Sequence, residues 1–239
     1  MKKTTLLLVP LAVFLWIAQP GFAGVQYRLE FFGAGSMPIQ KNFEITTPQS
    51  SVPLRCAQEF SFGARGGVRV GTDGRGRWGQ DFIYSFGTNP TKIVNQSNQS
   101  QFAFTSRIHQ FSYNALWYPA GSGLGRESGA FPYVTAGVGG SFHILPQTAV
   151  NEALDPNRGG LGKLHSENVF DFNAGGGVRF KINRRFGVRI DVRDFMSRAV
   201  RYGLPQSSPD PKVTVFPITG VLHRIEASFG LVIYFKPGD

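Results

Sequence analysis

The chain is poor in cysteine, in charge and in long apolar runs. Cys56 is the only cysteine among 239 residues, so no disulfide can form within the chain, whereas small exported domains usually carry several. We expect Cys56 to be free, with pairing between two chains as the alternative. Charged residues make up 17% of the chain, below the roughly 25% of typical soluble domains. Beyond residue 23, no segment resembles a membrane-spanning helix.

Signatures of cofactors, metals and nucleic acids are also lacking. The glycine-rich strings "GTDGRG" and "AGGGVRF" are not followed by a helix, which a nucleotide-binding loop requires. His143, His165 and His223 do not have the spacing of metal ligands. The net charge is +10, but an exported chain rarely meets nucleic acid. We therefore expect no cofactor, no metal and no nucleic acid, and anionic lipid headgroups as partners.

The first residues are typical of a secretory signal. A basic start, "MKK", precedes an apolar run from Leu6 to Ala18, which at about thirteen residues is too short to span a membrane. Small residues at Gly21 and Ala23 suit a cleavage site. The sequence thus predicts a signal peptide over 1–23 and one mature domain over 24–239. An uncleaved anchor helix is the disfavoured alternative, because prolines bracket the apolar run.

The segment "FGVRIDVRDFM", residues 186–196, alternates apolar with charged or small residues. That period of two is the repeat of a β-strand with one apolar face and one polar face. Seven other segments show it: 25–32, 60–70, 81–87, 101–119, 132–142, 170–182 and 224–235. In 101–119 the alternation slips near Gln110, which predicts a β-bulge. No helical periodicity competes after the signal, so we expect an all-β protein with eight strands.

The connections between these strands alternate in length. Long connections are expected at about 35–59, 143–168 and 198–220, and a medium one at 89–100; the others, "TDGRGR", "PAGSGLGRESG" and "NRR", are shorter. This is the asymmetry of outer-membrane barrels, which have short periplasmic turns and long extracellular loops. The sequence therefore predicts an eight-stranded antiparallel up-and-down transmembrane β-barrel.

The polar faces of the strands would line the barrel interior. An eight-stranded barrel is just wide enough for side chains to fill it, and buried charges require partners. We expect an interior ion-pair network instead of an open pore, with in-facing glycines making room for the arginines. Its expected members are Arg28, Glu30, Arg65, Arg69, Asp171, Arg179, Arg189, Asp191, Arg193, Arg224 and Glu226. Aromatic girdles are expected to include Tyr27, Trp117, Tyr118, Phe170 and Phe235.

Three stretches carry a resemblance to a known family. "PYVTAGVGG", "FNAGGGVRFKINRRFGVRIDVRDF" and a last strand that ends in an aromatic residue resemble the small outer-membrane β-barrel family of the OmpA/OmpX type. The resemblance implies an outer-membrane location and contact with lipid and lipopolysaccharide, but it carries no catalytic residues. Phe235 is not the final residue, unlike the family pattern. No OmpA-like periplasmic domain is recognised, so a wall-tethering role is not expected.

These features favour a non-enzymatic, monomeric barrel with a structural role or a role in adhesion or interaction through its long loops. A lipid-A-modifying barrel enzyme is one alternative. His109 and Ser112 would be its candidate residues, but they are three positions apart instead of two, on opposite faces of a regular strand, and no partner acid is evident. A soluble periplasmic lipocalin-like barrel that binds a ligand is the other alternative.

Overall fold

The structure is a computed structural model that describes residues 25–47, 50–74, 76–95, 101–155, 163–207 and 215–235. The predicted signal peptide lies outside these residues and stays a prediction. The strands are β1 (Gln26–Pro38), β2 (Lys41–Thr47), β3 (Ser50–Phe60), β4 (Gly63–Asp73), β5 (Trp78–Asn95), β6 (Gln101–Trp117), β7 (Gly129–Ile144), β8 (Glu167–Lys181), β9 (Phe186–Arg198) and β10 (Val221–Phe235), and the helix is α2 (Gln147–Leu154). No helix in the described part of the chain has the length and apolarity needed to span a membrane.

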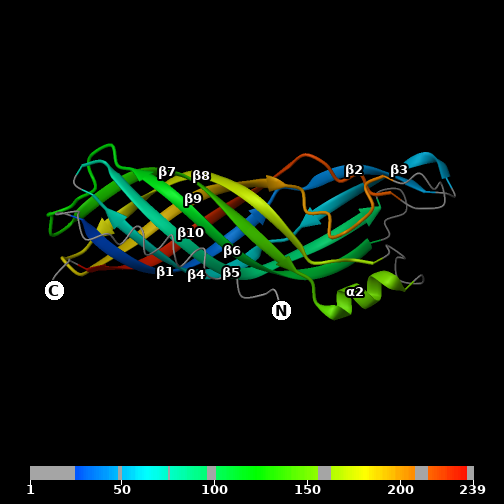
Figure 1. Cartoon of the computed structure of the whole chain (residues 1–239), viewed down its shortest axis with the longest axis horizontal. Coiled ribbons are helices and arrows are strands. Elements are labelled where there is room, and N and C mark those ends of the chain that lie inside the picture. Colours follow the sequence, from blue (N-terminus) through cyan, green and yellow to red (C-terminus); the bar gives the residue numbers. More distant parts are fainter. Residues whose placement is uncertain are drawn as a thin grey trace, which may run out of the picture.

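Eight strands, β1 and β4 to β10, form a closed antiparallel barrel (Figure 1). Each barrel strand is hydrogen-bonded to the next one along the chain. The wall is closed where β1 pairs with β10, from Tyr27 opposite Phe235 to Pro38 opposite Arg224. The predicted eight-stranded up-and-down barrel is therefore confirmed.

The barrel is inverted relative to a water-soluble β-protein. Large apolar side chains such as Ile190 and Phe229 point outward and are about half exposed, at 49% and 53%, whereas charged side chains such as Arg189 are buried inside. A soluble protein buries its apolar side chains and almost never buries unpaired charge. A lipocalin-like barrel would need an apolar interior where this barrel has buried charges, so this alternative is not favoured.

Short turns gather at one end of the barrel and long connections at the other (Figure 1). The turns β4–β5, β6–β7 and β8–β9 lie at the first end, together with the start of β1 and the end of β10. The predicted alternation of connection lengths is thus present. Two long connections contain structure that the sequence analysis did not expect: the β1–β4 connection holds the β2–β3 hairpin, and the β7–β8 connection holds α2.

The predicted bulge near Gln110 is wrong. β6 keeps one continuous register with β5 and with β7. Even-numbered residues face inward along the whole strand, and only the character of the two faces changes. In the half of β6 near the short turns, the outward side chains are apolar, as at Phe111. In the half near the long loops, the inward side chains are apolar, as at Phe102 and Phe104. The break in the sequence alternation therefore reflects apolar side chains moving from the outer to the inner face of a regular strand.

The long-loop end has a hydrophobic core of its own. β3 pairs with the distal part of β5, from Cys56 opposite Asn95 to Phe60 opposite Thr91, so that β2, β3, β5 and β6 form a sheet beyond the barrel wall (Figure 1). We call this part the head, formed by residues 41–60, 91–106, 145–169 and 199–222 where described. Its buried core includes Phe43, Ile45, Cys56, Ile93, Phe102, Phe104, Leu145, Ala149, Ala153, Leu164, Val200, Tyr202, Leu204, Phe216, Ile218 and Leu222.

The helix α2 belongs to this core. Its buried residues are Ala149 and Ala153, which lie four positions apart and therefore on one helical face. Eight residues are too few to give a clear periodic signal in the sequence, and much of this helix is polar. The expectation that no helix follows the signal segment is therefore wrong at this connection.

Candidate functional site

All eleven charged residues predicted to line the interior are buried in the lumen. None of them is more than 6% exposed. They reach the lumen because each lies on the inward phase of its strand. The structure groups them at three levels along the barrel axis, one near the short turns, one in the middle and one below the head.

At the middle level, Arg189 bridges carboxylates from three strands. Its Nη1 lies 2.7 Å from Oδ2 of Asp81 and 3.2 Å from Oε2 of Glu30. Its Nη2 lies 3.1 Å from Oδ2 of Asp191, and its Nε donates to the Tyr133 hydroxyl at 2.6 Å. One guanidinium thus connects β9 with β1, β5 and β7.

Arg69 and Arg193 complete this middle cluster. Arg69 pairs with Glu30 through Nη1, and its Nη2 donates to the Ser228 hydroxyl at 2.7 Å and lies 3.3 Å from Asp191. Arg193 places Nη2 3.1 Å from Oδ2 of Asp191. Three guanidinium groups therefore share Asp191, and the charges on β1, β4 and β9 are held together across the lumen.

Near the short turns, Asp73 is the centre of a second cluster. Its Oδ2 lies 2.9 Å from Arg28 Nε and 2.7 Å from Arg179 Nη1, and its Oδ1 accepts a hydrogen bond from Tyr118 at 3.1 Å. Arg179 also donates to the backbone carbonyl of Ser122 at 2.9 Å. The β6–β7 connection is thereby tied to the lumen wall. Tyr118 is fully buried here, so its predicted place in an outer girdle is wrong.

Below the head, Gln110 joins two arginines. Its Oε1 accepts hydrogen bonds from Arg65 at 2.7 Å and from Arg224 at 2.6 Å, and its Nε2 donates to Asp171 at 3.3 Å. Glu226 lies 3.5 Å from Arg65 Nε across the lumen.

The expected grouping of Glu226 with Arg189, Asp191 and Arg193 needs a correction. Glu226 lies directly opposite Arg193 in the β9–β10 register, but the two side chains diverge. Arg193 turns toward Asp191, whereas Glu226 pairs with Arg65. Strand adjacency placed the residues at one level, and the choice of partner across the lumen depends on side-chain directions.

Sequence reasoning missed two carboxylates of the lumen. Asp81 lies on the inward phase of its strand together with Ile83 and Ser85, so the alternation already placed it inside, yet it was not included. Asp73 was assigned to a turn, but β4 continues to that residue. Strand ends are the least certain part of a sequence-based assignment.

Glycines on the inward face leave room for the network, as expected. A Cβ added at Gly71 would lie 2.3 Å from a carboxylate oxygen of Asp81, and one at Gly230 would lie 2.3 Å from Oε1 of Glu30. Real Cβ atoms do not approach other atoms so closely. These two positions therefore accept only glycine while the buried carboxylates stay in place.

His109 and Ser112 do not come together. His109 is on the outer face, where its Nδ1 lies 2.9 Å from the Tyr84 hydroxyl. Ser112 is buried inside, where it accepts a hydrogen bond from Asn114 at 3.2 Å. The geometry expected of a lipid-A-modifying enzyme is not formed by this pair. Within the described residues, no group of three or more His, Cys, Asp or Glu side chains is placed to hold a metal ion.

Comparisons with known proteins identify the architecture. No protein-family model and no curated protein sequence matches the chain. Among solved structures, the outer-membrane protein OprG of Pseudomonas aeruginosa matches with a TM-score of 0.55 and 11% identity, over 91% of this chain and 99% of that one. AlkL matches with a TM-score of 0.47 and 13% identity, over 92% and 95% of the two chains. The N-terminal barrel domain of Pseudomonas aeruginosa OprF gives 0.41 and 14%, over 88% and 97%. The chain therefore has the fold of the small eight-stranded outer-membrane β-barrels.

Proposed function

We propose that this chain is an integral outer-membrane barrel with a sealed lumen, which presents its head at the cell surface for a structural or adhesive role and has no enzymatic activity. The apolar outer face supports the membrane location, since it would otherwise meet water. β5 and β6 have 18 and 17 residues, whereas roughly 9–11 residues cross the membrane. Both strands would therefore extend well beyond the lipid.

The short-turn end would face the periplasm and the head the cell exterior, as in barrels of this class. The head supports an interaction role because it is a packed unit and not a set of simple loops. Its buried core joins β2, β3, α2 and the long connections. A rigid scaffold that presents surface segments is the common basis of recognition, and the nature of the partner depends on those segments and not on the barrel.

A sealed lumen is supported by the charged clusters that cross it at three levels. Proteoliposomes that contain the purified protein are expected to swell in arabinose no faster than empty liposomes. A general porin in the same preparation provides the positive control. Swelling at the porin's rate would contradict the sealed lumen.

The role of the head can be tested on intact cells. We would compare cells that carry the full chain with cells that carry a variant whose residues 41–60 are replaced by a short Gly-Ser linker. Retention on fibronectin- or collagen-coated surfaces and release of periplasmic enzyme under detergent stress are the two readouts. The full chain is expected to improve at least one of them. Equal values in both, at equal surface levels of the two proteins, would contradict the proposed role.

A further inference from the structure

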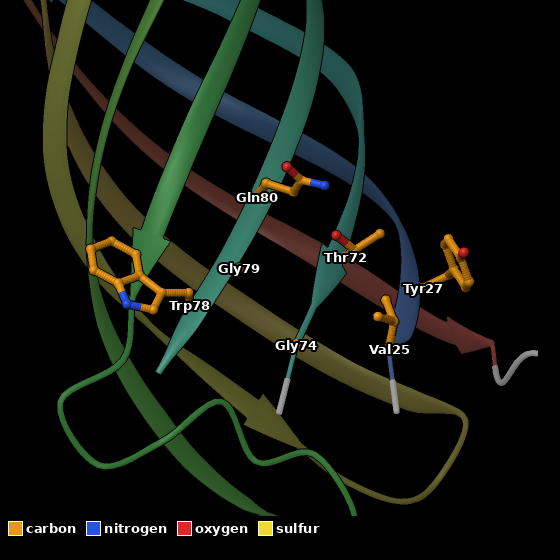
Figure 2. Close-up of a pocket in the computed structure, with 7 residues that line it drawn as sticks. All are labelled: Val25, Tyr27, Thr72, Gly74, Trp78, Gly79 and Gln80. Carbon is orange, nitrogen blue, oxygen red and sulfur yellow. The ribbon is translucent and has the colours of Figure 1, made fainter. Parts of the chain in front are cut away.

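A groove lies on the outer wall of the barrel, at the short-turn end (Figure 2). Its volume is about 210 Å³. The residues that line it are Val25, Tyr27, Thr72, Gly74, Trp78, Gly79 and Gln80. Sites that enclose a small molecule measure roughly 300–1,000 Å³, so this groove suits part of a chain that lies along the wall.

The groove exists because small residues on β4 lie between large ones on its neighbours. Thr72 is opposite Tyr27 on β1 and opposite Gln80 on β5. Gly74 and Trp78 follow on the same outer face, toward the turn. Two aromatic side chains thus stand on either side of a floor made of a hydroxyl-bearing residue and a glycine (Figure 2).

The two walls have the chemistry of a membrane interface. Trp78 is 64% exposed, and aromatic rings with one polar edge concentrate at the level of lipid headgroups. The Tyr113 hydroxyl donates to Gln80 at 2.5 Å, which places a further polar group beside the groove. Apolar contact is therefore available along the groove, and polar contact at its edge away from the short turns.

The end of the barrel next to the groove is positively charged. Arg77 is exposed and directly precedes Trp78 in the β4–β5 turn. The other turns at this end expose Arg126, Arg184 and Arg185 against one acid among the described residues, Glu127, which pairs with Arg184. Anionic headgroups are attracted to such a rim.

We propose that the groove binds an anionic phospholipid of the periplasmic leaflet. Its acyl chain would lie over Thr72 and Gly74, between the rings of Tyr27 and Trp78, and its phosphate would lie beside Arg77. This inference rests on the proposed membrane function, because the groove meets lipid only if the outer wall does. Lipopolysaccharide is not the occupant, since it belongs to the opposite leaflet.

Quenching of Trp78 fluorescence by brominated lipids tests the site. The full chain would carry Trp16→Phe and Trp117→Phe, so that Trp78 is the single tryptophan. Trp117 lies directly opposite Trp78, so a companion variant would replace all three tryptophans by phenylalanine and carry Ile190→Trp on the outer face of β9. Each is reconstituted in phosphatidylcholine vesicles with a minor fraction of brominated phosphatidylglycerol, or of brominated phosphatidylcholine. One cation near the surface contributes roughly 1 kcal/mol, so we expect Trp78 to favour the brominated phosphatidylglycerol about fivefold.

Two pairs of variants locate the preference. Thr72→Leu fills the floor and Arg77→Gln removes the charge, and each is expected to abolish the preference. Ala136→Leu adds similar bulk to the outer face of β7, and Arg185→Gln removes an exposed cation from the β8–β9 turn on the other side of the barrel, so both should keep it.

The outcomes separate this inference from the proposed function. Equal quenching of Trp78 by both lipids would overturn the lipid site but leave the barrel in the membrane. Quenching in the Ile190→Trp companion, with Trp78 protected from both lipids, would mean that protein, such as a second copy, covers the groove, and would also overturn the lipid site. If neither tryptophan is quenched by either lipid, the membrane location itself is contradicted.

Discussion

At the scale of single residues, the arginines of the lumen act as connectors between distant strands. Arg189 alone touches carboxylates from β1, β5 and β9. Removing charge from water is costly, and breaking one member of a buried cluster leaves its partners uncompensated. Because the carboxylates in this cluster are themselves shared, the cost of losing one arginine should spread over several strands.

Arg189→Leu is therefore expected to lower the free energy of unfolding by about 3–5 kcal/mol. Urea titration of the protein in lipid vesicles, followed by the heat-dependent gel shift, would measure the change. Arg184→Leu is the matched control, because its pair with Glu127 is exposed and should contribute less than about 1 kcal/mol. The same loss in both variants would show that the lumen network does not stabilise the barrel.

Cys56 offers a second residue-scale prediction. Burial in the head raises the pKa of its thiol to about 11 from the ordinary 9.0. Only the thiolate reacts with iodoacetamide, so at pH 8 the folded protein should hold roughly a hundredfold less reactive thiolate than the unfolded chain. Alkylation followed by mass spectrometry, with and without denaturant, measures this ratio. Equal rates would mean that the β2–β3 hairpin, which carries Cys56, does not pack against the core of the head.

At the scale of elements, Glu167 joins the start of β8 to the β9–β10 connection. Its Oε2 accepts hydrogen bonds from the backbone N–H groups of Arg201 and Tyr202, each at 2.7 Å, and its Oε1 lies 2.8 Å from Arg198. Tyr202 has a φ of 54°, an uncommon value for a residue with a side chain. The carboxylate thus holds a strained turn at the centre of the head.

Glu167→Ala should loosen this connection without opening the barrel. The loss of hydrogen bonds to this part-buried carboxylate costs about 1–3 kcal/mol, so amide exchange at residues 199–204 should become roughly 5- to 150-fold faster. Amides of β9 from 188 to 193 should not change. As a control, Glu44→Ala removes a partner from an exposed pair with Arg55 and should leave exchange at 199–204 unaltered. Unchanged exchange in the Glu167 variant would contradict the anchoring role.

The sequence predicted the barrel strands well, because an apolar outer face and a charged lumen impose a strict period of two. The same rule misled at β6, where the apolar and polar sides exchange as the strand passes from the barrel wall into the head. The β2–β3 hairpin and α2 were missed because their packing depends on contacts between connections far apart in the chain. The alternation predicted most of the charges that enter the lumen, with Asp73 missed at a strand end, but not which partners these charges choose.

At the scale of the whole molecule, the chain combines two kinds of core. The barrel interior is held by charge and hydrogen bonds, and the head by apolar packing. With the proposed membrane location, this division follows from the surroundings: lipid would cover the outside of the barrel, whereas water would surround the head. The account therefore depends on the outward side chains of the barrel strands meeting acyl chains.

Spin labels on β9 test that claim most directly. Val188, Ile190 and Val192 would be replaced one at a time by a nitroxide-labelled cysteine in a Cys56→Ala background, and the protein would be reconstituted in vesicles. Power-saturation measurements compare collisions with oxygen, which concentrates in the bilayer, and with a water-soluble nickel chelate. We predict high oxygen and low nickel accessibility at all three positions. High nickel accessibility there would contradict the account, because the apolar wall would then face water.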